Sequence, residues 1–559
     1  MADMTIAEAS LEWEFTLLND EITIKRYLGS SKSIVVPSSI DGKKVTRIDP
    51  LTFTHDLDLS KVNRNCPLIT IELPNTIKEI EEETFKWCYF LGKIIIPEGI
   101  EKIGEDAFIW CTALKDVTLP SSIQEIGKGA FRRCFALKHI NIPSHVQKID
   151  AYAFEDCKEL DDVVIPQSVT YLGPEVFNGC TSLSKIIIPT SIHEINDDAF
   201  NGCVELKSIT LPSGLTRIGN GAFKNCLPIT EIDIPETVTE IGKEAFYGCG
   251  ALTSFTFPSH IHKINGFTLY DCVSLCEVNL PEGITEIDDS AFDRCGALKA
   301  ITIPQSVAKL GNCVLKDCAT LTSIVIPKNV KEIGNCAFYG CTNATSIIIN
   351  GPIKKLSDDT LYECSALTSF TIPESVEEIG FGVFKGCTKL KSITIPDGVK
   401  AIGSRAFTKC KAIQSIVLPK DIKIVGRGAF SDHDTIEVYA RSLNVFWEDD
   451  SKTKAVLGYC HQYNQGERHD EAEVNEYIEY IKYRGNKIYP FALKNENLLY
   501  FMTQHKIIPA SDLGQLLMDS IRSGVSIRAI LLEYQNKLGA AALQEEDDDD
   551  LFFSSDFEL

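Results

Sequence analysis

Fifteen of the twenty cysteines recur at a fixed spacing, and this is the first pattern in the sequence that could do chemistry. They stand every 23 residues, at 88, 111, 134, 157, 180, 203, 226, 249, 272, 295, 318, 341, 364, 387 and 410. Thiolates at regular intervals could form a metal-binding or redox stack, but metal sites need two or more ligands close together, as in C-x2-C pairs. A free cysteine is also a small, commonly buried side chain. The column therefore predicts core packing and no metal site.

Cys313 and Cys336 are also 23 residues apart, but at another phase. In other turns this phase holds residues as different as Glu83, Gly129 and Tyr152, and such mixed chemistry indicates a surface position. The two cysteines are either a thiol pair on adjacent turns or a chance coincidence.

The histidines and glycines show no catalytic motif. Only His260 and His262 are close in sequence, and alternation would place them on one side of an extended segment, as a weak metal or proton site or simply as an exposed pair. There is no H-E-x-x-H, phosphate loop, dinucleotide fingerprint or G-x-S-x-G elbow. The isolated Gly219-Asn220-Gly221 string lies at the turn position of a repeat. We therefore expect neither an enzyme nor a cofactor.

The elements that position these residues are repeats of 23 residues. Proline recurs at this step from 74 to 327 and again at 373, 396 and 419, and Asn350 fills the one broken slot. Eleven residues after each proline slot stands Phe, or Leu at 269, 315 and 361. The span from 74 to 419 contains 345/23 = 15 steps, hence 16 turns. A period of this length predicts a repeat solenoid whose turns bury their apolar faces against each other.

Each turn begins with a short strand. In one turn, Ile324 and Ile326 are expected to point inward, Ser323 and Val325 outward, and Pro327 to end the strand. A second short extended piece follows, and in this turn it carries Val330 and Ile333.

The rest of the turn contains Gly334 and Ala337-Phe338. The glycine is expected to permit a change of direction. Ala337-Phe338 are expected to begin a one-turn helical segment whose ring packs inside the coil.

The pattern L-x-S-I-x-I-P-x-x-V-x-x-I-G-x-x-A-F-x-G-C resembles the BspA-type leucine-rich repeat over residues 34–431. The segments 21–27, 34–37 and 41–45 are similar to the N-terminal hairpin cap of that family. The resemblance implies a curved parallel-sheet solenoid with a role in binding or adhesion. Exported members begin with a signal peptide, whereas the N-terminus here has acids and no apolar segment, so surface adhesion is not carried over directly.

Outward positions of the strands are the candidate binding face. The position two places before each proline slot holds a mixture of polar and β-branched side chains. The position four places before each slot holds mostly charged side chains in the earlier turns and small, neutral ones in the later turns. Such a surface could accept an extended partner or a flat protein surface, although Thr and Val also simply suit strands. The candidate residues are Thr210, Asp233, Thr256, Asn279, Thr302, Val325, Ser323, Ser346, Ser369, Thr371, Ser392 and Thr394.

Beyond Phe430 the period stops and helical spacing begins, as in Leu513, Leu516, Leu517 and Ile521. Four or five short helices in antiparallel pairs are expected, as a cap over the last turn, a partner-binding module, or both. The acidic end is expected to be disordered, either as a recognition motif or as a solubilising tail. The expected domains are an N-terminal cap (1–50), a leucine-rich-repeat solenoid (51–432), an α-helical domain (433–540) and a tail (541–559).

The net charge of −23 and the lack of a basic block argue against binding to nucleic acid or an anionic membrane. No apolar run reaches the roughly 18 residues of a membrane span. We therefore expect a cytoplasmic protein-protein interaction scaffold, with a cell-surface or secreted adhesin as the alternative. An enzyme in the helical region would require a polar cleft there.

Overall fold

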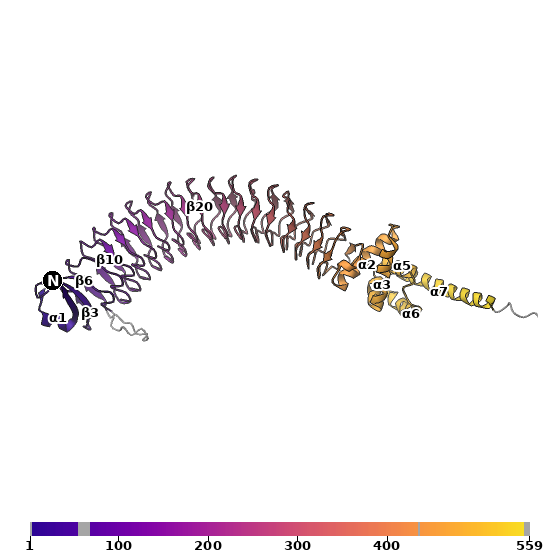
Figure 1. Cartoon of the computed structure of the whole chain (residues 1–559), viewed down its shortest axis with the longest axis horizontal. Helices are drawn as coiled ribbons and strands as arrows, with labels where there is room; N and C mark the ends of the chain where they lie inside the picture. Colours follow the sequence, from indigo (N-terminus) through magenta and orange to yellow (C-terminus); the bar gives the residue numbers. More distant parts are fainter. Residues whose placement is uncertain (1–2, 54–67, 434–435, 553–559) are drawn as a thin grey trace, which may run out of the picture. The chain divides into compact units, whose positions relative to one another are not determined.

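The protein is a parallel β-solenoid of leucine-rich repeats followed by an α-helical region (Figure 1). The computed structural model describes residues 3–53, 68–433 and 436–552, with side chains described to 539. The chain divides into two compact units, Met1–Ala344 and Thr345–Leu559. The solenoid contributes turns to both units.

The N-terminal segment forms a five-stranded sheet with strand order β1-β5-β6-β3-β2. Strands β2 and β3 make an antiparallel hairpin that includes residues 13–18, which the sequence analysis did not assign to the cap, and Asn19 and Asp20 adopt left-handed backbone angles in it. β3 then pairs in parallel with β6. The elements are β1 (Asp3–Met4), α1 (Ile6–Glu12), β2 (Trp13–Leu18), β3 (Glu21–Tyr27), β4 (Ser33–Val35), β5 (Ser39–Ile40) and β6 (Lys43–Ile48).

The first strand of each turn lies just before the proline slot. Its middle residue is turned inward, which is what the alternation of side chains predicts. In the first unit these strands are β7 (Thr70–Glu72), β8 (Lys93–Ile95), β10 (Asp116–Thr118), β12 (His139–Asn141), β14 (Asp162–Val164), β16 (Lys185–Ile187), β18 (Ser208–Thr210), β21 (Ser254–Thr256), β23 (Glu277–Asn279) and β26 (Ser323–Ile326). In the second they are β28 (Ser346–Ile349), β30 (Ser369–Thr371), β32 (Ser392–Thr394), β34 (Ser415–Val417) and β36 (Glu437–Tyr439).

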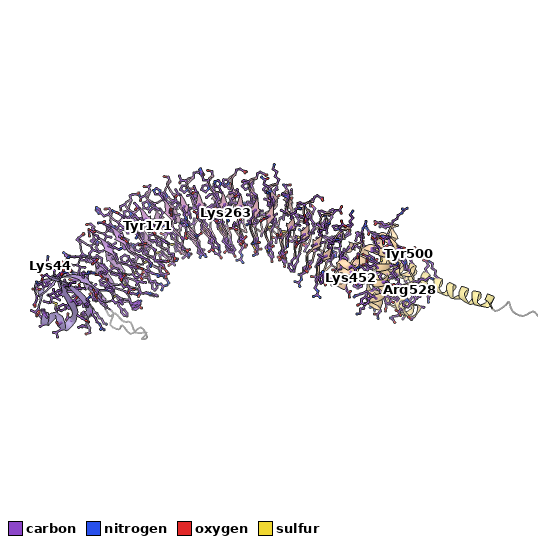
Figure 2. The ribbon with its side chains drawn as sticks, viewed as in Figure 1. Lys44, Tyr171, Lys263, Lys452, Tyr500 and Arg528 are labelled. Carbon is purple, nitrogen blue, oxygen red and sulfur yellow. The ribbon has the colours of Figure 1, made fainter. Side chains whose placement is uncertain are left out.

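The second strand of each turn has two residues, an outer one followed by a buried Ile, Leu or Val. In the first unit these strands are β9 (Lys102–Ile103), β11 (Glu125–Ile126), β13 (Lys148–Ile149), β15 (Tyr171–Leu172), β17 (Glu194–Ile195), β19 (Arg217–Ile218), β20 (Glu240–Ile241), β22 (Lys263–Ile264), β24 (Glu286–Ile287), β25 (Lys309–Leu310) and β27 (Glu332–Ile333). In the second they are β29 (Lys355–Leu356), β31 (Glu378–Ile379), β33 (Ala401–Ile402) and β35 (Ile424–Val425). Tyr171 and Lys263 project outward from this series (Figure 2).

Pairing between turns keeps the 23-residue register with three kinds of exception, one of which is the 22-residue step from β34 to β36. Residues 231–233 and 300–302 do not form strands, so the expected first strand is missing from those two turns. The step from β4 to β7 is 70 − 33 = 37 residues, because the first turn carries extra chain. The remaining pairs, such as Ser254 with Glu277, are parallel and in register.

The expected helical turn is wrong, because the segment after each second strand is a run of hydrogen-bonded turns. Two positions in this run adopt positive φ, as at Asp106 (52°) and Trp110 (64°), and a right-handed helix cannot pass through them. The Phe108 N–H donates instead to the Ala130 carbonyl of the next turn at 2.8 Å. The run therefore stacks like a strand, through bonds between turns.

Gly334 has a different role from the one expected. It has no left-handed φ, but a Cβ added there would lie 2.5 Å from Asn312 N and from Gly311 C in the preceding turn. Glycine is required because two backbones approach closely, and the change of direction is made elsewhere in the turn.

The core consists of the two predicted columns. Phenylalanine rings of successive turns stack nearly parallel, as in Phe177, Phe200 and Phe223, with centroids 5.6 Å apart at each step. The column cysteines are buried and form no disulfide bonds among the described residues. Thiols of this column donate to carbonyls 26 residues earlier, as Cys226 does to Phe200 at 3.2 Å.

The C-terminal region contains six α-helices among the described residues, rather than four or five. They are α2 (Asp449–Asn464), α3 (Glu471–Arg484), α4 (Tyr489–Ala492), α5 (Glu496–Gln504), α6 (Ala510–Asp519) and α7 (Val525–Phe552), with short 3-10 segments η1 (Leu443–Val445), η2 (Gly485–Ile488) and η3 (Ser520–Arg522). Lys452, Tyr500 and Arg528 mark α2, α5 and α7 (Figure 2). Helix α2 packs against β36 on one side and α5 on another, and α7 packs on α5 and α6.

Two expected boundaries fall inside elements of the structure. β36 pairs in parallel with β34, so the solenoid continues past residue 432. Ser415 pairs with Glu437, a step of 22 residues, and a search for a 23-residue period therefore does not detect this strand. Helix α7 continues to Phe552, so the expected disordered tail from 541 begins within a helix. Alanine, leucine and glutamate after 540 are strong helix formers, and no proline interrupts them. Residues 553–559 lie outside the described residues.

Candidate binding surface

The predicted strand-face residues lie on the outside of the solenoid. Ser346 is half-buried, and the other eleven are exposed: Ser323, Val325, Thr210, Asp233, Thr256, Asn279, Thr302, Ser369, Thr371, Ser392 and Thr394. Asp233 and Thr302 are exposed on turns without a first strand, whereas the others belong to strands. The structure therefore brings them to one side of the turns within each unit.

Neighbouring strands make this face a ladder of side chains. Thr256 pairs in register with Asn279, and the Asn279 Nδ2 donates to the Thr256 Oγ1 at 3.1 Å. Cross-strand contacts of this kind stabilise a sheet locally and leave the outer side open.

The first turns carry a charged row on the same face. Lys93, Asp116, His139 and Asp162 stand next to one another in register on β8, β10, β12 and β14. The row combines the positive charge of Lys93 with the negative charges of Asp116 and Asp162. It offers specific ionic contacts without a general attraction for polyanions.

Beside the charged row lie exposed apolar side chains. Val164 is 72% exposed and Ile187 is 67% exposed, while their neighbours Val163 and Ile186 are buried in the core. β14 and β16, which carry them, lie side by side. Exposed β-branched side chains in adjacent positions indicate a candidate contact surface, because their burial by a partner would lower the free energy of the complex.

The two neighbouring histidines form an exposed pair that does not converge. The His260 Nδ1 contacts the Glu236 carbonyl of the preceding turn at 3.1 Å, and the His262 Nδ1 contacts the Gly283 carbonyl of the next turn at 3.3 Å. No group of three possible metal ligands occurs within the part of the chain that the structure describes.

A polar pocket of about 560 Å³ borders the strand face in the second unit. Part of its lining is formed by Tyr439 at the end of β36, Arg441 just after it, and His469 and Asp470 before α3. Most of these groups are already engaged: Asp470 caps α3 through the Glu473 N–H at 2.7 Å, and the His469 Nδ1 lies 3.4 Å from Glu473 Oε2. A polar cleft is thus present, but its side chains mainly stabilise the start of α3.

A second surface, which the sequence analysis missed, lies on the turn side of the repeats. The Arg133 guanidinium lies 4.5 Å from the Trp110 ring, and Tyr247 stacks on Tyr270 at 4.6 Å. The phase twelve residues after the proline slot could have indicated it, because consecutive turns there hold only aromatic or charged residues from 224 to 339. That phase holds Lys224, Tyr247, Tyr270, Asp293, Lys316 and Tyr339.

Asp293 is the one carboxylate of this phase with a strongly altered pKa. It is 4% exposed, and burial raises its pKa from 3.8 to about 6. Ser290 donates to Oδ2 at 3.4 Å, while the Lys316 Nζ remains 4.0 Å from Oδ1, which has no hydrogen-bond partner among the described residues. Glu155, at the same phase six turns earlier, has Arg132 Nε at 2.6 Å.

Comparison with known families agrees with this geometry. A model described as a BspA type leucine-rich repeat region of six copies matches residues 78–207, 193–322 and 314–437. The chain belongs to this family. The matched segments of the BspA-type repeats begin before β8 and end at Glu437, the first residue of β36. No curated protein matches the chain.

Solved structures of bacterial leucine-rich-repeat proteins are similar to this BspA-type chain. One from Bacteroides ovatus is 24% identical, with 77% of this chain and 98% of that chain covered and a TM-score of 0.48. A leucine-rich-repeat protein of T. pallidum is 29% identical over 39% and 89%, with a TM-score of 0.31. A leucine-rich cell surface protein from Faecalibacterium prausnitzii is 25% identical over 72% and 92%, with a TM-score of 0.33.

Among the described helices, none combines the length and apolar character needed to cross a bilayer.

Proposed function

We propose that this BspA-type repeat protein is an interaction scaffold that binds a protein partner through the exposed face of its first strands. The observation that carries the proposal is the pair of exposed apolar side chains, Val164 and Ile187, on adjacent strands beside the charged row. A protein surface can cover such side chains and also pair with the charged row next to them. Nucleic acid is a poor fit, since the net charge is −23.

The test adds three positive charges to this face in the full chain. We expect Val164→Arg, Ile187→Arg and Thr210→Arg together to reduce partner capture at least tenfold, because buried unpaired charges oppose an apolar contact. Cross-linked partners from native cells would be quantified by mass spectrometry.

The matched control places the same charges on the same three turns, immediately before the second strands. Thr170, His193 and Thr216 are exposed there, so Thr170→Arg, His193→Arg and Thr216→Arg should leave capture unchanged. Equal capture by both triple variants would contradict a binding role for the first-strand face.

We further propose a cytoplasmic location, in a reducing compartment. The support is the column of buried thiols outside any disulfide bond, in which thiols such as Cys226 act as hydrogen-bond donors in the core. Cell fractionation with thiol titration tests this: a surface or secreted protein would show oxidised or blocked cysteines outside the column and would be recovered outside the cytoplasmic fraction.

A further inference from the structure

Cys313 and Cys336 occupy equivalent positions on two successive turns, outside the buried cysteine column. Both are half-buried and outside any disulfide bond, and both adopt nearly the same left-handed backbone, with φ of 54° and 55°. The Cys313 N–H donates to the Asn335 carbonyl at 2.8 Å, which holds the two turns in register at this point. The Cys313 thiol is also in hydrogen-bond contact with the Cys336 side chain.

This placement satisfies the main requirement for a disulfide bond. Stacked turns are separated by about 4.8 Å, which is within the roughly 4.4–6.8 Å that two cysteine Cα atoms need. Because the side chains already touch, the bond requires little movement of the backbone.

Charged groups surround the pair. Lys316, three residues after Cys313, favours the thiolate, whereas Asp293 and Asp289 disfavour it, and burial is the largest influence raising the pKa of Cys313. Since the pKa of Cys313 is raised, its reactivity toward a disulfide depends on the closeness of the second thiol and not on an activated thiolate.

We propose that Cys313 and Cys336 are a reversible redox modification site, which low-molecular-weight disulfides oxidise to a bond between adjacent turns. One thiolate attacks a sulfur of oxidised glutathione, forms a mixed disulfide and releases one reduced glutathione. The second thiolate then attacks the protein sulfur of the mixed disulfide and releases the second reduced glutathione. The two cysteines lose two protons and two electrons in total, and the glutathione disulfide gains them.

The neighbouring column thiols do not compete. Cys318 and Cys341 follow the pair by five residues each, are fully buried and donate to backbone carbonyls at 3.1 and 3.3 Å. Burial raises the pKa of Cys341 to about 12, so its thiolate is nearly absent at neutral pH.

The experiment equilibrates the reduced full chain in buffers of increasing oxidised-to-reduced glutathione ratio, traps free thiols by alkylation and maps peptides without reduction. We expect a peptide pair linking 313 to 336, which returns to two free thiols when the ratio is reversed. The unmodified chain is the main sample, so the result does not depend on a variant that folds. Absence of the linked pair in a natively folded chain, with each cysteine only free or glutathionylated, would overturn the proposal.

Two variants sharpen the result. Cys313→Ser should abolish the cross-link and leave Cys336 capable only of a mixed disulfide. Cys276→Ser is the matched control, because Cys276 is another half-buried cysteine and its sulfur contacts the Ser274 carbonyl at 3.3 Å. Loss of the 313–336 link in Cys276→Ser would mean that the bond forms through thiol exchange elsewhere, which also contradicts the proposal.

Discussion

The cysteine column is explained at the scale of single residues by hydrogen bonding as well as by size. The Phe200 carbonyl accepts the Cys203 N–H of its own turn at 3.2 Å and the Cys226 thiol of the next turn at 3.2 Å. A thiol is small enough for the core and still a weak donor, and alanine or valine cannot supply that donor. The repeat therefore uses one side chain both to fill space and to connect turns.

The phenylalanine column should tolerate leucine but not alanine. Phe200 is fully buried between two parallel rings, and the chain itself has Leu269, Leu315 and Leu361 at the same phase. We expect Phe200→Ala to lower the free energy of unfolding by about 3–5 kcal/mol through the cavity it leaves, and Phe200→Leu to cost about 1 kcal/mol. Urea unfolding followed by circular dichroism measures both, and equal losses would contradict the comparison.

Asp293 should make stability depend on pH. Burial raises the pKa of Asp293 from 3.8 to about 6. Between pH 3.8 and about 6 the folded state therefore keeps a proton that the unfolded state releases, and the free energy of unfolding falls as the pH rises through this range. We expect Asp293→Asn to stabilise the protein at pH 7 by up to about 3 kcal/mol and to have little effect near pH 4.

The control for Asp293 is the equivalent carboxylate at Glu155. Burial also raises the pKa of Glu155, but Arg132 pairs with this carboxylate and would lose its partner, so Glu155→Gln should not give the stabilisation at pH 7 that is expected for Asp293→Asn. The measurement is the urea midpoint of each variant from pH 4 to 7.5. A stabilisation by Asp293→Asn that is the same at every pH would show that burial of its charge is not the cause.

At the scale of elements, the backbone conformation of each repeat is determined by close contact between the backbones of adjacent repeats and by residues with left-handed backbone angles. The sequence predicts the first strand well, because Ile324 and Ile326 alternate with outward residues and are buried as expected. It fails for the segment around Phe108, since Asp106 and Trp110 are ordinary residues for a helix and nothing in their types reveals a positive φ. The bonds to the next turn, which hold these angles, involve residues 22 positions away.

Glycines of the close-contact phase should therefore be far more sensitive than other glycines. A Cβ at Gly242 would lie 2.5 Å from Asn220 N and Gly219 C, whereas one at Gly296 would meet nothing within 4 Å. We expect Gly242→Ala to destabilise the protein by more than about 2 kcal/mol, and Gly296→Ala to change stability by less than about 1 kcal/mol. Comparable urea midpoints for the two variants would refute the close-contact explanation.

At the scale of the whole molecule, an exact period in the sequence predicts the solenoid, and local departures from that period limit the prediction. Fold class and both core columns follow from residue spacing, because each turn must bury the same face. The last strand was missed because β36 follows β34 after 22 residues. The sequence places the candidate face on the outside of the turns, where Thr210 and Ser369 are exposed, but exposure does not reveal a partner. The polar pocket beside β36 could not be predicted, because it forms only where the helices pack against the last turn, and residue spacing does not specify that packing.

The helical region should stabilise the C-terminal end of the solenoid as a cap. Helix α2 lies so close to β36 that a Cβ at Gly458 would be 2.5 Å from the Val438 carbonyl oxygen, and Lys454 donates to the Phe430 carbonyl at 2.7 Å. We expect Gly458→Ala to separate α2 from β36 and to increase hydrogen exchange at the amides of 437–439 and of the neighbouring strand β34, because an uncapped last turn frays. Gly514→Ala in α6 is the control: a Cβ there meets nothing within 4 Å, so it should leave exchange in β36 unchanged and stabilise α6 by about 0.5–1 kcal/mol. Unchanged protection of β36 in Gly458→Ala would mean that the last turn is stable without α2, and the helices would then have to be explained by a role other than capping.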